Sequence, residues 1–357
     1  MNNRQLYHKM LQQLCQWLPN ERVTRQRNGA MLIIGLYLSK AVHLSHIVRC
    51  LPMAGQDLSL VNRLRRFLDN PRMDIGQWYE PIARQLVAPL TGQPIRLVID
   101  CTKVGFGHRV MMIGVQYRRR TLPLAWSIHR GSKGHTTERQ QVKLLQRVQA
   151  ILPTDSPISL VGDAGFAHIG VLRWLTDHQW VFVIRVPGRY KVRCASGDWL
   201  KINQLPLLPG QTMVIGWVRL TEANDAGWFW LLLHWEQGED EPWYLVSQTI
   251  TDTRQMLHTY ERRMWIEEMF GDMKGHGFDL ETTHLRDANR ISRLVWGVCV
   301  AYVWLLSIGS WLVKRGLRHW IDCKSRRDKS YFRLGWDWIA RCQRLDTPVP
   351  LRFVPCF

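Results

Sequence analysis

The stretch PIRLVIDCT, residues 94–102, is a short run of apolar and β-branched residues that closes on Asp100. This composition is typical of a buried β-strand. A second run, SPISLVGDAGF at residues 156–166, has the same character and leads into Asp163. Functional sites of open α/β sheets collect at the carboxyl ends of the strands. The two aspartates therefore indicate a candidate site at one edge of a sheet.

The segments around these two runs alternate between strand and helix patterns. Beyond the two runs we expect strands at 109–120, 121–130 and 181–187, and helices at 136–152 and 168–180. The predicted order is strand, strand, strand, helix, strand, helix, strand. This is an α/β arrangement, with the acidic residues at the ends of its first and fourth strands.

The chain on either side of this core has a different character. Residues 1–92 predict an all-α N-terminal domain, because apolar residues recur there at three- and four-residue spacing. Arg63, Arg65 and Arg66 form a basic face that either contacts DNA phosphates or is simply solvated. We divide the rest into the first part of the core (93–187), a β-rich insertion (188–250), the second part of the core (251–313) and a basic C-terminal tail (314–357).

The charge balance favours a polyanionic partner. Lys and Arg total 48 and Asp and Glu total 29, which gives a net charge of +19 and a pI near 10.0. Such an excess favours nucleic acid or an anionic membrane surface. An uncharged run of 20 residues at 294–313 is long enough to span a bilayer. A helix buried in a large core is also apolar all round, and we favour burial because no second run of this kind exists.

The cysteines and the N-terminal residues indicate the compartment. The eight cysteines include no C-x-x-C pair, which argues against a zinc site and against a disulfide scaffold. Residues 1–20 contain no apolar signal segment. We therefore expect a cytoplasmic protein.

The stretch YERRMWIEEMFGDMKGHGFDLE, residues 260–281, predicts a helix with two faces. At about 100° per residue, Tyr260, Arg263, Glu267 and Lys274 share a strip roughly 60° wide, if the helix persists through Gly271. The apolar residues fall on a separate face that can dock on a sheet. Ordinary i,i+4 pairs on a solvated face are the alternative interpretation of this strip.

Three carboxylates, those of Asp100, Asp163 and Glu267, form the donor set that a pair of Mg²⁺ ions prefers. Two such ions about 3.5–4 Å apart clamp the attacking and leaving oxygens of an in-line phosphoryl displacement. Basic residues on the same strip can hold a phosphodiester backbone.

These residues resemble a bacterial insertion-sequence transposase of the insertion-sequence-4 type. The signature of that family is Tyr, two residues, Arg, three residues, Glu, six residues and Lys, and it is met here by Tyr260, Arg263, Glu267 and Lys274. Asp100 in IDCT and Asp163 in GDAGF match the two aspartates of the family's Asp-Asp-Glu triad. The Trp that often follows the signature Arg is replaced by Met264, and the Arg that often follows the second aspartate by Ala164.

The resemblance implies an RNase H-like catalytic core with a β-strand insertion, preceded by an all-α N-terminal domain. It implies a DDE transposase that cuts an insertion sequence at its inverted-repeat ends and joins it to target DNA. Asp100, Asp163 and Glu267 would hold two Mg²⁺ or Mn²⁺ ions. Tyr260, Arg263 and Lys274 would contact DNA near the cut.

The same resemblance implies partners and place. Double-stranded DNA would be the partner, the chain would act as a homodimer in a synaptic complex, and it would associate with the bacterial nucleoid in the cytoplasm. Three rivals remain: a nuclease that never joins strands, a domesticated DNA-binding protein, and a membrane protein anchored through 294–313.

Overall fold

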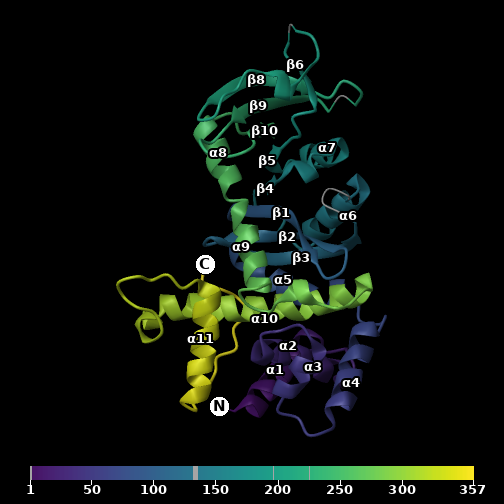
Figure 1. Cartoon of the computed structure of the whole chain (residues 1–357), viewed down its shortest axis with the longest axis vertical. Coiled ribbons are helices and arrows are strands. Elements are labelled where there is room, and N and C mark those ends of the chain that lie inside the picture. Colours follow the sequence, from purple (N-terminus) through teal and green to yellow (C-terminus); the bar gives the residue numbers. More distant parts are fainter. Residues whose placement is uncertain (1, 132–135, 196, 225) are drawn as a thin grey trace.

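The N-terminal part of the chain is helical in the computed structural model, which describes residues 2–131, 136–195, 197–224 and 226–357. The first four of its helices gather at one end of the molecule, and the fifth lies against the sheet (Figure 1). They are α1 (Asn3–Trp17), α2 (Val23–Ser39), α3 (Leu44–Cys50), α4 (Asp57–Asp69) and α5 (Ile75–Val87). Two of these starts follow from local sequence: the side chains of Asn2 and Asp74 accept hydrogen bonds from the first turns of α1 and α5.

The core follows the predicted order of strands and helices. Its elements are β1 (Ile95–Val104), β2 (His108–Tyr117), β3 (Arg120–Arg130), α6 (Glu138–Gln149), β4 (Ile158–Gly162), α7 (Ile169–Asp177) and β5 (Val181–Arg185). The first three strands form an antiparallel meander, and β1, β4 and β5 run parallel to one another. The expected α/β fold class with an RNase H-like core is confirmed.

The strands that follow the core extend its sheet. They are β6 (Lys191–Arg193), β7 (Leu200–Lys201), β8 (Thr212–Leu220), β9 (Trp228–His234) and β10 (Trp243–Ser247). Because β10 pairs antiparallel with β5, the described strands join into one sheet in the order β3-β2-β1-β4-β5-β10-β9-β8-β6-β7. Figure 1 shows these later strands at the end of the molecule opposite the N-terminal helices.

One long helix, α10 (Ala288–Lys314), connects the sheet to the N-terminal helices (Figure 1). It contacts β3 and α5 as well as α2 and α4. By length and composition alone α10 could cross a membrane, but 94% of its apolar window is buried inside the protein. The uncharged run at 294–313 is therefore part of a helix buried in the core.

The C-terminal segment adds a helix to the same core. Helix α11 (Tyr331–Arg344) packs against α10 and buries Phe332, Trp336 and Ile339. The two helices approach through glycines: a Cβ on Gly335 would lie 1.8 Å from the carbonyl oxygen of Leu305. A Cβ on Gly309 would lie equally close to the carbonyl oxygen of Tyr331. Part of the basic tail is therefore structural.

We predict that Gly335→Ala destabilises the protein, because a methyl group cannot fit against the α10 backbone. Overpacking of this kind costs about 1–3 kcal/mol. The measurement is the midpoint of thermal unfolding, with Gly275→Ala as the control, since a Cβ on Gly275 meets nothing within 4 Å. Equal midpoints for the two variants would contradict the close packing of α10 and α11.

Candidate active site

The two predicted aspartates lie side by side at the sheet edge. The parallel register of β1 and β4 pairs Ile99 with Gly162, so the next residues, Asp100 and Asp163, leave the paired region together. Residues in register on parallel strands project to the same face of the sheet. Asp100 is buried, with 7% of its surface exposed. Asp163 caps a short 3-10 turn, and its Oδ1 accepts from the Gly165 N–H at 2.9 Å.

One detail differs from the sequence prediction. Asp100 does not end its strand, because β1 continues to Val104 through its antiparallel pairing with β2. What ends at Ile99 is the pairing with β4. The parallel pairing therefore stops just before Asp100, and beyond it β1 continues as the outer strand of an antiparallel extension with β2 and β3.

The prediction of one continuous helix carrying Tyr260, Arg263, Glu267 and Lys274 was wrong. Helix α8 (Thr253–Glu261) ends before Arg262, and α9 (Met264–Met273) begins after Arg263. At the junction the Arg263 N–H donates to the Tyr260 carbonyl, a three-residue step that tightens the turn. Lys274 lies just after α9, with φ −97° and ψ −129°, outside the helical conformation. The four residues do not share one helix.

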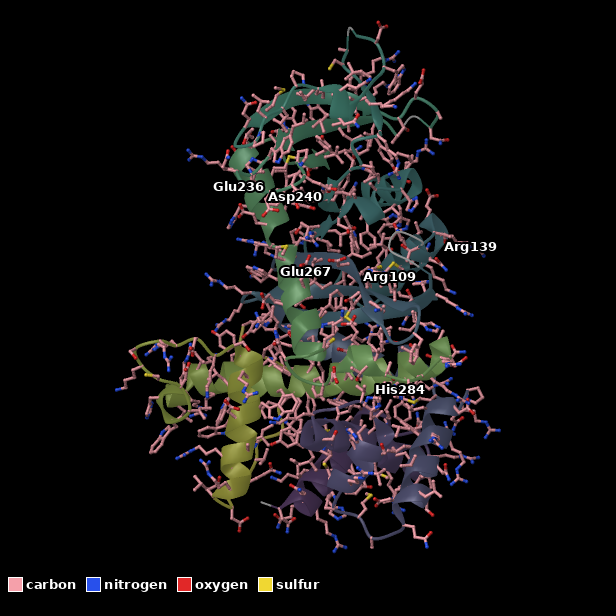
Figure 2. All side chains as sticks on the ribbon, viewed as in Figure 1. Arg109, Arg139, Glu236, Asp240, Glu267 and His284 are labelled. Atoms are coloured by element: carbon pink, nitrogen blue, oxygen red, sulfur yellow. The ribbon has the colours of Figure 1, made fainter. Side chains whose placement is uncertain are left out.

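Arg263 nevertheless connects two of the predicted carboxylates. Its Nη1 lies 2.9 Å from Asp100 Oδ2 and 2.7 Å from Glu267 Oε1. Glu267 stands in the first turn of α9, and Figure 2 shows it on that helix beside the sheet. The neighbouring Glu268 points elsewhere, since its carboxylate pairs with Arg120 at 3.0 Å. Of the two adjacent glutamates, Glu267 is therefore the one that faces Asp100.

The charges of Asp163 and Glu267 both act on Asp100. Burial, followed by repulsion from Asp163, raises the pKa of Asp100 to about 7. The guanidinium of Arg263 and the Cys101 N–H, which donates to Asp100 Oδ1 at 2.6 Å, act in the opposite direction. The charge of Glu267 adds a smaller upward contribution.

The donor set suits a divalent cation, although its present spacing does not form a complete metal site. Within the described residues no group of three or more His, Cys, Asp or Glu side chains is placed to hold a metal ion. The Arg263 nitrogen, however, already sits as a cationic group between Asp100 and Glu267. Carboxylate oxygens are the ligands that Mg²⁺ prefers. The residues thus fit such an ion in chemistry, with Arg263 standing in for its charge.

The predicted DNA contacts occupy three different environments. Tyr260 is only 3% exposed, and its ring packs edge-on against Trp243 with centroids 4.9 Å apart. Arg263 is engaged by the two carboxylates. Lys274 Nζ lies 3.3 Å from Glu281. The structure does not gather the three into one exposed strip.

A cavity of about 680 Å³ extends from Asp100 and Asp163 towards the segment after β5. Its wall includes Arg109 and Arg185, neither of which the sequence analysis singled out. Arg185 is paired with Glu241 at 2.8 Å. These residues come from β2, β5 and the loop before β10, and no local spacing in the sequence could have linked them.

The class of protein defined by this fold is a mixed α/β protein with an RNase H-like core. Residues 86–304 match the family model described as the transposase DDE domain. The chain therefore belongs to the family of transposases with a DDE domain. It is a DNA transposase, a metal-dependent enzyme that cleaves and joins DNA.

Two further comparisons complete these findings. A cryo-EM structure of the piggyBac transposase synaptic complex with hairpin DNA is similar at a TM-score of 0.42 and 10% sequence identity. That similarity covers 97% of this chain and 80% of the other. The comparison with curated protein sequences found no match.

We predict that Asp100 makes the metal-free protein less stable as pH rises. Folding raises the pKa of this carboxyl from 3.8 to about 7, so the folded state binds the extra proton between these values. The contribution of Asp100 to stability is therefore complete below pH 3.8 and is lost as pH rises through about 7. With a chelator present, the thermal midpoint of the wild type should fall relative to Asp100→Asn between pH 4 and pH 8. If the thermal midpoints of the two proteins change with pH in parallel, the raised pKa of Asp100 is contradicted.

Proposed function

We propose that this DNA transposase is of the insertion-sequence-4 type and that Asp100, Asp163 and Glu267 are its catalytic triad. It would cut an insertion sequence at its inverted-repeat ends and join it to target DNA. The observation that carries the proposal is the Arg263 bridge between Asp100 and Glu267, with Asp163 beside Asp100. The spacing of Tyr260, Arg263, Glu267 and Lys274 supports the assignment to this type.

The triad would hold two Mg²⁺ ions, or Mn²⁺ in their place. Bound together, such ions clamp the attacking and leaving oxygens of an in-line phosphoryl transfer. The protein's own contribution is to fix the carboxylates: Asp100 by the register of β1, Asp163 by its cap on the 3-10 turn, and Glu267 by the first turn of α9. Asp100 must also release its proton, because a carboxylate binds a cation only when ionised.

Arg263 would change partners in the course of this reaction. A cation bound by Asp100 and Glu267 would compete with Arg263 for their carboxylates, which Arg263 now contacts. Released from them, its guanidinium presents a planar fork that suits a phosphate. This exchange reconciles the proposed DNA contact by Arg263 with its present ion pairs. Tyr260, whose ring lies 5.9 Å from the Arg263 guanidinium, would support it, and Lys274 would contact the backbone next to the cut.

The N-terminal helices would bind the DNA backbone outside the catalytic centre. A cavity of about 530 Å³ between α2 and the α4–α5 turn is lined by Arg22, Arg25, Arg63, Arg66 and Arg72. Arg25 is paired with Glu21, and Arg63 Nε donates to Asn28. In the described part of the chain, the side chains of Arg22, Arg66 and Arg72 have no acidic partner.

Two further parts of the proposal concern assembly and place. Two copies of the chain would act as a homodimer, each engaging one inverted repeat in a synaptic complex. With a net charge of +19, the protein would be found on the nucleoid in the bacterial cytoplasm.

The triad is tested by a pair of adjacent variants. Glu267→Gln keeps the size of the side chain but removes the charge that a hard cation needs, so cleavage should fall by orders of magnitude. Glu268→Gln is the matched control, because Glu268 pairs with Arg120 instead. The assay is cleavage, in Mg²⁺, of a duplex carrying the element's end, with binding measured in parallel. A dead Glu268→Gln and an active Glu267→Gln would show that the register on α9 is wrong.

The N-terminal groove is tested through salt dependence. Each phosphate contact contributes about −0.9 to the slope of log affinity against log salt. Arg66→Ala should therefore weaken binding to the end duplex and make the slope shallower by about one contact. The control is Arg4→Ala, an exposed arginine that does not line the groove. Identical slopes for the wild type and Arg66→Ala would remove this groove from the DNA path.

A further inference from the structure

Arg109 brings a positive charge to the cleft beside Asp100, in addition to the charge of Arg263. It lies near the start of β2, opposite Lys103 of β1, and it lines the cavity that also contains Asp100 and Asp163. The partner of Asp100 on β2 is Met112, three residues further along. Because side chains alternate along a strand, Arg109 projects from the face of the sheet opposite to Asp100. Figure 2 shows Arg109 on the sheet and Glu267 on the helix α9 beside it.

The guanidinium of Arg109 is incompletely satisfied. One terminal nitrogen, Nη2, donates to the Cys101 carbonyl at 3.3 Å. The Nε atom is buried and has no hydrogen-bond partner in the described part of the chain, and no acidic side chain described there pairs with Arg109. A buried donor without a partner costs about 1–3 kcal/mol, and more when the group is charged. Because Nε is buried, an external ligand would meet the terminal nitrogens, and the charge of the guanidinium at the cavity wall has no described carboxylate to balance it.

The other arginines of this cavity do not present the same feature. Arg185 is neutralised by Glu241, at 2.8 Å, and it also donates to the Pro242 carbonyl. Arg189 is exposed to solvent, so water can satisfy its donors. Arg263 does not line the cavity; its Nε also lacks a partner among the described residues, but its Nη1 contacts Asp100 and Glu267. Arg109 is thus the half-buried arginine of the cleft whose charge the protein does not balance with a described carboxylate.

We propose that Arg109 binds a phosphate of the DNA strand that enters the cleft, on the far side of Asp100 from Arg263. A guanidinium matches a phosphodiester because its parallel N–H groups contact two oxygens. The two arginines would then hold the strand from both faces of the sheet edge and position it across the carboxylates. This inference rests on the proposed function, which supplies DNA as the ligand. It adds a substrate-binding residue outside the Tyr-Arg-Glu-Lys signature.

A purely structural role for Arg109 is the competing explanation. Its hydrogen bond to Cys101 could simply fasten the β1–β2 extension. Arg109→Gln removes the charge, and its amide nitrogen ends at the position of Nε, short of the Cys101 carbonyl, so DNA binding and thermal stability are measured on the same variant to separate the two roles. Arg109→Lys keeps the charge and loses the fork. The control is Arg139→Gln, an exposed arginine in the first turn of α6 that does not line the cavity.

The first measurement is binding without metal. Fluorescence anisotropy in a chelator would report the affinity of each full-length protein for a duplex that carries the element's terminal repeat, read from the DNA flanking the coding sequence. Arg109→Gln should lose about tenfold in affinity and about 0.9 of the salt slope. Arg139→Gln should retain the affinity of the wild type. A lowered thermal midpoint with unchanged affinity and slope would assign Arg109 a structural role and overturn the proposal.

The second measurement identifies the phosphate. Single methylphosphonates, which remove the charge of one phosphate, are placed in turn at each position around the cleavage site. At one position the wild type should lose affinity while Arg109→Gln loses nothing further, since the contact is already absent. Additive losses at every position would overturn the proposal. Neither measurement needs cleavage, whereas the proposed triad is tested by cleavage. A failure of the Arg109 proposal can therefore be told apart from a failure of the proposed triad.

Discussion

Two carboxylates held side by side at a sheet edge repel each other, and a bound proton or a nearby positive charge must offset that repulsion. The parallel register of β1 and β4 fixes Asp100 beside Asp163, and burial of Asp100 removes the water that would screen the repulsion. The guanidinium of Arg263 offsets part of this cost by contacting Asp100 and Glu267 together. The short junction between α8 and α9 places Arg263 against the sheet, where its guanidinium contacts Asp100.

The rest of the fold supports the sheet that carries this edge. The later strands join the core sheet through β10, so the region around the carboxylates belongs to one continuous hydrogen-bonded ladder. Helix α10 packs on β3 and on the N-terminal helices, and α11 locks onto it at Gly309 and Gly335. A catalytic constellation must be held within a fraction of an ångström, and a sheet braced by a buried helix provides such support.

Much of the fold could be predicted from the sequence, because strand and helix periodicities are local. The order of core elements and the burial of residues 294–313 followed from these patterns, and so did the placement of Asp163 just after β4, whereas Asp100 lies inside β1. The break at Arg262 and Arg263 could not be seen, since arginine is a good helix former and nothing there signals a stop. The approach of α10 and α11 and the cavity lined by Arg109 depend on contacts between distant segments, which periodicity does not record.

The position of Arg263 has a consequence for how metal and DNA act on one another in the proposed mechanism. Its guanidinium contacts the carboxylates of Asp100 and Glu267, which the proposed mechanism assigns to a cation, so each would weaken the binding of the other. A phosphate that draws Arg263 away leaves these carboxylates short of positive charge and raises their affinity for a cation. By thermodynamic linkage, the cation must raise the affinity for the phosphate by the same factor. One arginine can thus couple arrival of the DNA end to assembly of the metal site, so that full cleavage chemistry forms when both are present.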